Sequence, residues 1–287
     1  MSYRIEQIVE CETYLGESPV WDVETGIFWW VDGTGRRKGK DNIFRLEPRS
    51  GKVDARAIPD HDIGALAIRK DGGLVLALDD GFYFYDFERD NLALITPIEE
   101  EQPRTRLNDG KVDRRGRFIA GGMDDLEELA ICGIWRLDPD LSTHQIGGGI
   151  ICTNGPSWSP DDKTFYITDT FQDVMWAYDY DIETGALSNH RDFASTKGQD
   201  GVCDGSTVDS EGCVWTAELR TGELVRRTPD GEEERRIGMP VKNITSVMFG
   251  GADLDELYVT SMARIDHPGA GAHDAFVTED HPQFGAG

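Results

Sequence analysis

Four side chains with oxygen atoms that could bind a metal ion recur at one position of a repeated sequence pattern. Each repeat has an apolar residue, an acidic or glycine-rich turn, and a short strand of aromatic or β-branched residues. The apolar residues that open the six repeats are Trp21, Ile68, Val112, Trp158, Val208 and Phe249. Four residues before them stand Glu17, Gly64, Asn108, Asn154, Asp204 and Thr245. Hard divalent cations prefer carboxylate and amide oxygens, so the four carboxylate and amide side chains of this set predict a cation site wherever the repeats converge.

The spacing of the repeats predicts an architecture in which they converge. The repeats follow one another at intervals of about 40–50 residues, the length of a propeller blade. A second strand signal follows in most repeats, as in Phe82–Tyr85 and Met175–Tyr178, and helical periodicity is scarce. We therefore expect an all-β protein, a single six-bladed β-propeller over residues 1–287 with a metal site at its centre. The first strand of each blade would line the central channel, so that equivalent residues face one another.

The last repeat is shorter than the others. After Val259–Met262 the chain has no second apolar hairpin, and residues 263–287 are rich in glycine, histidine and acidic residues. We expect an incomplete last blade followed by an irregular tail. The sequence leaves open whether this blade is truncated, whether the end of the ring is unusual, or whether residues near Ile5–Val9 help to close it.

Each of the polar residues, taken singly, has a simpler explanation. An Asn-Gly or Asp-Gly pair at the entrance of a strand is commonly a turn. Four such residues at one register of a ring favour the metal site, because two carboxylates and two amides without a counter-charge would repel and be poorly solvated. The six histidines show no paired spacing of the zinc-site type. The expected cofactor is one divalent cation: Ca²⁺, Mg²⁺, Mn²⁺, Zn²⁺ or Fe²⁺.

Composition argues against several classes of partner. The formal charge is −25, from 54 acidic and 29 basic residues, which argues against nucleic acid and anionic membranes. No run approaches the roughly 18 apolar residues of a membrane helix, and the start of the chain does not resemble a signal peptide. The five cysteines form no Cys-x-x-Cys pair, so we expect reduced core residues in a cytoplasmic protein. The excess of aspartate over lysine indicates a salt-adapted host.

Motifs for other kinds of chemistry are absent from the sequence. There is no Gly-x-Ser-x-Gly nucleophile motif, no phosphate-binding Walker loop and no dinucleotide-binding glycine pattern after a strand. Gly147–Gly149 lies between strand signals and is interpreted as a turn. Chemistry at the predicted centre would therefore use a metal and water.

Four stretches of the chain resemble one known family. They are Leu15–Trp21, Arg106–Asp113, Thr153–Pro160 and Asp204–Asp209, and they extend over nearly the whole chain. They resemble the senescence-marker-protein, gluconolactonase and luciferin-regenerating-enzyme family of six-bladed propellers. The four stretches follow one another in the same order as the family's motifs.

This resemblance assigns roles to the polar residues. It implies that Glu17, Asn154 and Asp204 are the protein ligands of one catalytic divalent metal. It also implies that Asn108 contacts the substrate or the metal, and that Arg106 and Asp109 line the substrate pocket. The family places an acidic residue after a Gly-Thr-Met segment, and three residues here are candidates for it: Asp124, Asp125 and Glu127.

The expected function is metal-dependent hydrolysis of a sugar-acid lactone, such as gluconolactone or xylonolactone, to the open-chain acid. Asp204 would be the general base as well as a ligand, with Asp109 as the other candidate, while Arg106 and Asn108 would orient the sugar hydroxyls. Two alternatives remain open. One is hydrolysis of a phosphotriester or fluorophosphate on the same scaffold, and the other is a non-catalytic propeller that binds calcium and a protein partner.

Overall fold

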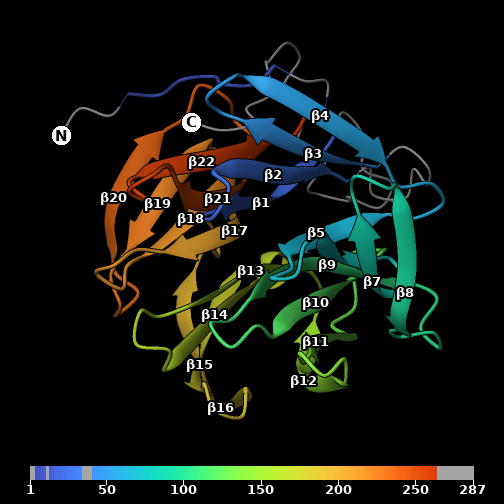
Figure 1. Ribbon diagram of the computed structural model, residues 1–287. Coiled ribbons are helices and arrows are strands. Elements are labelled where there is room, and N and C mark those ends of the chain that lie inside the picture. Colours follow the sequence, from blue (N-terminus) through green and yellow to red (C-terminus); the bar gives the residue numbers. More distant parts are fainter. Residues whose placement is uncertain (1–3, 11–12, 34–40, 264–287) are drawn as a thin grey trace.

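The computed structural model describes residues 4–10, 13–33 and 41–263 of the 287-residue chain. In these residues the chain forms five antiparallel sheets of four strands and one sheet of two strands. Neighbouring strands in each sheet are consecutive in the chain. The sheets stand around a common centre like the blades of a propeller (Figure 1). The prediction of an all-β propeller is confirmed.

The blades follow the chain in order. The first contains β1 (Gly16–Asp22), β2 (Ile27–Asp32), β3 (Asn42–Glu47) and β4 (Lys52–Ala57). The second contains β5 (Ile63–Ile68), β6 (Leu74–Leu78), β7 (Gly81–Asp86) and β8 (Asn91–Pro97). The third contains β9 (Thr105–Val112), β10 (Phe118–Asp124), β11 (Cys132–Leu137) and β12 (Thr143–Ile150).

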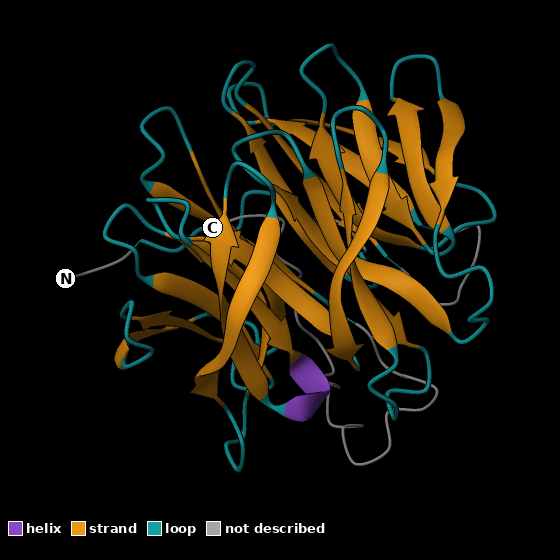
Figure 2. Ribbon diagram, turned by 90° about the horizontal axis from the view of Figure 1, so that it is seen from below, coloured by secondary structure: helices purple, strands orange, loops and turns teal. Residues whose placement is uncertain are grey.

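The second half of the chain continues in the same way. The fourth blade contains β13 (Thr153–Trp158), β14 (Thr164–Asp169), β15 (Val174–Asp181) and β16 (Ala186–Ser195). The fifth contains β17 (Val202–Val208), β18 (Val214–Leu219), β19 (Glu223–Arg227) and β20 (Glu233–Gly238). The last sheet consists of β21 (Ile244–Gly250) and β22 (Glu256–Ser261). The one helical element among the described residues is a 3₁₀ turn, η1 (Thr170–Gln172), purple in Figure 2.

The first strands of neighbouring sheets contact one another around the whole ring. β1 contacts β5, β5 contacts β9, β9 contacts β13, β13 contacts β17, β17 contacts β21, and β21 contacts β1. The inner wall of the propeller therefore closes with six strands. Residues that are equivalent in these strands face the same central axis.

The prediction of six blades is met only in part. Five blades have four strands, whereas in the described residues the last sheet has only β21 and β22, in agreement with the expected incomplete repeat. Apolar contacts from the start of the chain cover part of this sheet. Ile5 packs against the apolar cluster that contains Val247 and Val259, and Val9, 5% exposed, belongs to the cluster that contains Phe28 and Tyr258. Residues 264–287 lie outside the described part of the chain.

Blades stack on one another because alternate side chains of a strand point to opposite faces. In β2, Trp29 and Val31 pack against the second blade, in the cluster that contains Leu66. Phe28 points the other way, toward the last sheet, where its ring centroid lies 4.7 Å from that of Tyr258. Strands of this kind are buried on both faces, which explains the dense aromatic and β-branched runs.

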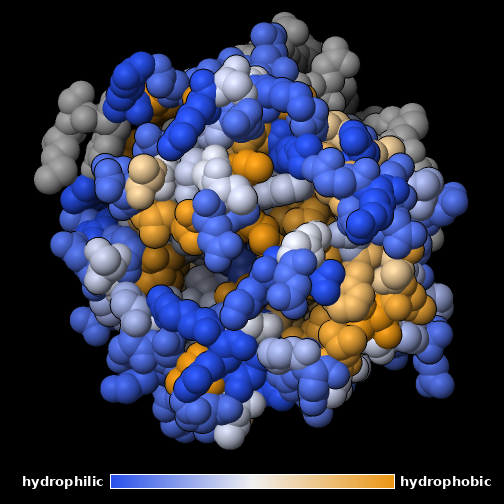
Figure 3. Space-filling model, in the orientation of Figure 1, coloured by the Kyte–Doolittle hydropathy of each residue, from blue (hydrophilic) through white to orange (hydrophobic). Residues whose placement is uncertain are grey.

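Polar side chains dominate the face of the molecule that Figure 3 shows. Apolar side chains form several patches on this face, near its centre and toward its left and lower right edges. Cys132, Cys152, Cys203 and Cys213 are buried and free, as predicted, while Cys11 lies outside the described residues. No helix in the described ranges has the length and hydrophobicity that a membrane crossing requires.

Candidate metal centre

A β-bulge interrupts each of the six inner strands. It lies at the position four residues before the apolar residue that opens each repeat, where the sequence predicts the cation ligands. The register shifts fall between Glu17 and Val20, Ile63 and Ala65, Leu107 and Gly110, Asn154 and Ser157, Cys203 and Ser206, and Ile244 and Ser246. A bulge adds one unpaired residue and turns its side chain away from the regular ladder. The residues that the repeats align with one another therefore lie where every inner strand is distorted.

Glycines allow neighbouring inner strands to approach each other at these bulges. A Cβ on Gly205, next to Asp204, would lie 2.0 Å from the Ser246 Oγ atom of the next blade. The second repeat has Gly64 in the ligand position itself, where a Cβ would lie 2.1 Å from the Asn108 carbonyl oxygen. The close approach of two backbones at this point explains why this repeat contributes no ligand side chain.

The structure brings the predicted site residues together. One small cavity of about 30 Å³ is lined by Glu17, Arg106, Asn108, Asp109 and Asn154, all from inner strands. The Asn108 Nδ2 atom donates to the Asn154 Oδ1 atom at 3.2 Å and to the Thr153 carbonyl at 2.8 Å. Asp204 belongs to the same group, because its carboxylate interacts electrostatically with both Glu17 and Asp109.

Burial raises the pKa values of all three carboxyl groups, and the charges of neighbouring carboxylates add to the shift in Glu17 and Asp204. Burial, followed by the charges of Asp204 and Asp109, raises the pKa of Glu17 well above its usual value. Burial and the charge of Asp109 do the same to the pKa of Asp204, and burial raises the pKa of Asp109. Three carboxyl groups in a desolvated space lack sufficient counter-charge, and a divalent cation would supply it.

Asp109 also has a structural part in the site. Its Oδ1 atom accepts from the Gly110 N–H group and its Oδ2 atom from the Gly155 N–H group, both at 2.7 Å. The second bond joins β9 to β13 immediately after Asn154. With both oxygens engaged by backbone donors, Asp109 is less available than Asp204 to receive a proton.

Lys111 is a site residue that the sequence analysis missed. Its Nζ atom donates to the Ser206 carbonyl oxygen, which ties β9 to β17 across the interior. Burial lowers the pKa of Lys111, while the charges of Asp109 and Glu17 act in the opposite direction. The available signal was its place in the stretch Arg106–Asp113, two residues after Asp109.

Arg106 lies at the edge of the cavity and is 9% exposed. Its Nη1 atom donates to the Leu107 carbonyl at 3.1 Å, and its Nε atom is 3.5 Å from the Asp125 carboxylate. Asp124 is fully buried and accepts hydrogen bonds from both Nε and Nη2 of Arg104. Of the three acidic candidates after Met123, Asp124 thus has a structural role and Asp125 is the one beside Arg106.

The donor set fits a hard divalent cation. Glu17 and Asp204 offer carboxylates and Asn154 offers an amide oxygen, which are ligands of Ca²⁺, Mg²⁺ and Mn²⁺ and are compatible with Zn²⁺ or Fe²⁺. The carboxylate oxygens of Glu17, Asp109 and Asp204 do not all lie within 4.8 Å of one another. The amide oxygens and water would complete the coordination.

Two other groups of potential ligands lie closer together in the described part of the chain. They are His61 with Asp79 and Asp80, and Asp209 with Glu211 and Cys213. In the first, the His61 Nδ1 atom and the Asp79 carboxylate form a hydrogen bond of 2.8 Å. In the second, Arg226 already pairs with Asp209 and Glu211. Internal hydrogen bonds and ion pairs account for both groups.

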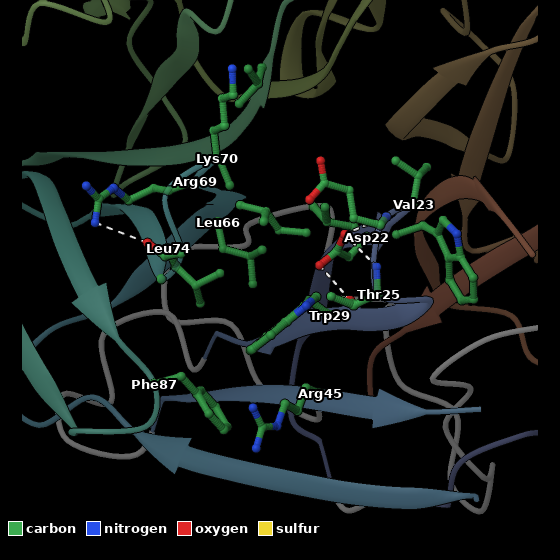
Figure 4. A pocket seen from close by; sticks show the side chains of 18 of the residues that line it. Asp22, Val23, Thr25, Trp29, Arg45, Leu66, Arg69, Lys70, Leu74 and Phe87 are labelled. Atoms are coloured by element: carbon green, nitrogen blue, oxygen red, sulfur yellow. Dashed lines mark hydrogen bonds between the residues drawn. The ribbon is translucent and has the colours of Figure 1, made fainter. Parts of the chain in front are cut away.

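A larger cavity of about 580 Å³ lies between the first two blades (Figure 4). It is lined mainly by β1, β5 and the turns that follow them, with Lys111 from the third blade, and none of Glu17, Asn154 and Asp204 is among its lining residues. Its charges are largely paired locally: Arg45 contacts Asp54 and lies over the Phe87 ring, and Asp22 accepts from Thr25. The small polar cavity, with its converging carboxylates, is therefore the candidate site.

Comparisons with known proteins place nearly the whole chain in one family. Residues 15–263 match the protein-family model described as SMP-30/Gluconolactonase/LRE-like region. Regucalcin of Xenopus laevis is 36% identical over 91% of this chain and 87% of its own length. The 6-deoxy-6-sulfogluconolactonase of Pseudomonas putida is 33% identical over 91% and 88%. A crystal structure described as the calcium-binding protein regucalcin, from Agrobacterium tumefaciens, has a TM-score of 0.85 with 28% identity, covering 98% of this chain and 90% of the other.

Proposed function

The chain belongs to the SMP-30/gluconolactonase/LRE-like family, and on that premise we propose that it hydrolyses a sugar-acid lactone with the help of one bound divalent cation. The observation that carries the proposal is the meeting of Glu17, Asn154 and Asp204 in one buried group. The pKa values of the Glu17 and Asp204 carboxyl groups are raised by burial and by neighbouring carboxylates, and a bound cation would balance these charges. A lactonase activity agrees with the names of the gluconolactonase and sulfogluconolactonase relatives.

The proposed ligands are Glu17, Asn154 and Asp204, and the cation would supply Lewis acidity toward the lactone carbonyl. Asp204 would accept the proton of the attacking water, because both oxygens of Asp109, the other candidate base, already accept hydrogen bonds from backbone N–H groups. Arg106 and Asn108 line the cavity and would orient the sugar hydroxyls by hydrogen bonds. The substrate class is an aldonolactone, such as gluconolactone or xylonolactone.

The proposal is tested by removing the ligand charges while keeping their shapes. Asp204→Asn and Glu17→Gln should each lower kcat/KM for gluconolactone by about 10²-fold or more, the range expected for loss of an acid–base or ligand group. The rate is measured as acid release above spontaneous hydrolysis, before and after chelation and with each divalent ion added back. Exposed Asp253→Asn is the matched charge control and should retain wild-type activity. Undiminished hydrolysis by chelator-treated Asp204→Asn would refute the proposal.

Calcium binding without catalysis is the second candidate function. It is favoured by the regucalcin relatives and by the description of one structural neighbour as a calcium-binding protein. This function predicts that the wild type binds Ca²⁺ with loss of binding in Asp204→Asn, yet hydrolyses none of a panel of aldonolactones. Including paraoxon in the same panel tests the phosphotriester alternative.

A further inference from the structure

Resting on the proposed function, we propose that Thr170 is a positioning residue that orients two cation ligands from neighbouring blades. Thr170 opens η1, directly after β14, and is 3% exposed. Its hydroxyl lies between the side chain of Asn154 on β13 and the backbone of β17 beside Asp204. Thr170 would act through these two ligands rather than as a ligand itself.

The hydrogen bonds of Thr170 have a defined direction. The Thr170 Oγ1 atom donates its single proton to the Cys203 carbonyl at 2.8 Å. Its lone pairs therefore face other partners, and it accepts from the Asn154 Nδ2 atom, also at 2.8 Å. Because the hydroxyl proton is already used, the amide of Asn154 must present its NH₂ group to Thr170.

This direction decides which atom of Asn154 faces the cluster. With Nδ2 held by Thr170, Oδ1 points to the opposite side, where it lies 3.2 Å from the Asn108 Nδ2 atom in the candidate centre. A flipped amide would present donors to the cation and an oxygen to the Thr170 lone pairs, which is unfavourable on both sides. The hydroxyl thus selects the amide orientation that can bind a cation.

The second bond holds the other ligand. Cys203 immediately precedes Asp204, in the bulged part of β17 between Cys203 and Ser206. A bulge leaves backbone groups without ladder partners, so the bond from Thr170 stabilises the distorted backbone that directs the Asp204 side chain inward. One hydroxyl therefore couples Asn154 of the fourth blade to Asp204 of the fifth.

Thr170 is itself rigidly placed. Its backbone N–H group donates to the Cys152 carbonyl at 3.1 Å. The preceding Asp169 is fully buried and caps η1, and its carboxylate accepts from the Ile151 N–H at 2.7 Å and the Gln172 Nε2 atom at 2.6 Å. These bonds join η1 to the start of β13, so the hydroxyl occupies a fixed point relative to Asn154.

The test is divalent-ion affinity of the chelator-treated full chain, measured by calorimetric titration with Ca²⁺ and with Zn²⁺. Thr170→Val keeps the side-chain shape and removes the hydroxyl, and should weaken binding about 10–100-fold, the usual effect of losing a group that orients a metal ligand. Thr170→Ser retains an alcohol that donates and accepts, and should restore affinity to within about threefold of wild type. Thr170→Ala replaces Thr170→Val if the latter does not fold.

The chain offers a matched control two residues earlier. Thr168 is fully buried on β14, the strand that precedes η1. It is paired with Asn154 in the β13–β14 register, and its hydroxyl has no hydrogen-bond partner in the described structure. Thr168→Val should leave ion affinity unchanged.

The possible outcomes separate this inference from the proposed function. If the wild type binds the ion and Thr170→Val binds it equally well, even with a lower melting temperature of the ion-free protein, Thr170 is merely structural and the inference is overturned. Equal weakening in Thr168→Val would overturn it as well. If the wild type binds no divalent ion at all, the proposed function fails and the inference falls with it.

Discussion

The buried carboxylate of Asp124 should make the stability of this protein depend on pH in a defined window. Asp124 ends β10 and is fully buried. Both of its oxygens accept from the Arg104 guanidinium, and its Oδ2 atom also accepts from the N–H groups of Glu128 at 3.0 Å and Leu129 at 2.8 Å. The carboxylate thus fixes the segment that follows the strand.

The sign of the pH effect follows from the direction of the pKa shift. Burial by itself would raise the pKa of Asp124, but the hydrogen bonds from Arg104 and from three backbone N–H groups outweigh it and hold the pKa well below its usual value. A carboxyl group whose pKa is lower in the folded state contributes its full stabilisation above the unfolded pKa. That contribution is lost as the pH falls through the folded pKa.

The perturbation is Asp124→Asn. The amide keeps the shape and one acceptor oxygen but loses the charge, and it turns an NH₂ group toward backbone donors. Hydrogen bonds to a charged group contribute about 1.5–3 kcal/mol, and breaking a buried pair costs about 3–5 kcal/mol. Because one acceptor survives, we expect a loss of about 2–3 kcal/mol in the free energy of unfolding at neutral pH.

Urea unfolding, followed by tryptophan fluorescence, measures this loss at about pH 7, 5.5 and 3. The deficit of Asp124→Asn relative to wild type should be equal at the first two pH values and smaller at the third. Exposed Asp253→Asn controls for the charge change and should differ little from wild type at any pH. A variant as stable as wild type at pH 7, or a deficit undiminished at pH 3, would show that the Arg104 contact does not stabilise the fold as argued.

Two further predictions concern packing and buried charge. Gly64→Ala places a Cβ 2.1 Å from the Asn108 carbonyl, where two backbones would have to separate, and should cost about 1–3 kcal/mol or more in urea unfolding. Gly238→Ala, at a strand position with nothing within 4 Å of the added Cβ, is its control and should be close to neutral; equal stability of the two variants would contradict the argument. Glu218→Gln leaves the Arg227 guanidinium, 4% exposed, without its carboxylate partner at 2.7 Å and should lose about 3–5 kcal/mol. Glu223→Gln, whose side chain is 32% exposed beside Arg236, should lose less than about 1 kcal/mol, and a similar loss in both variants would remove the role assigned to burial.

Part of the candidate site could be predicted from the sequence because its signals are local. Each bulge residue stands four residues before the apolar residue that opens its repeat. The repeat length and this fixed offset are therefore enough to select Glu17, Asn108, Asn154 and Asp204. The last sheet was expected to be incomplete for the same reason, since no apolar hairpin follows β22. Its covering by Ile5 and Val9 remained one of several options, because packing between the two ends of a chain leaves no periodic trace.

The amino-acid sequence by itself determined the strand pattern, the repeat length and the ring position of each polar residue, because each of these depends on neighbours a few residues away. The tertiary structure alone decided how those residues are held. The Lys111 bond to Ser206, the Asp109 bond to Gly155 and the Thr170 bond to Cys203 join different blades, between residues 33 to 95 positions apart in the chain. A hydrogen bond depends on angstrom-scale distance and direction, which exist only after the blades have packed around their common axis.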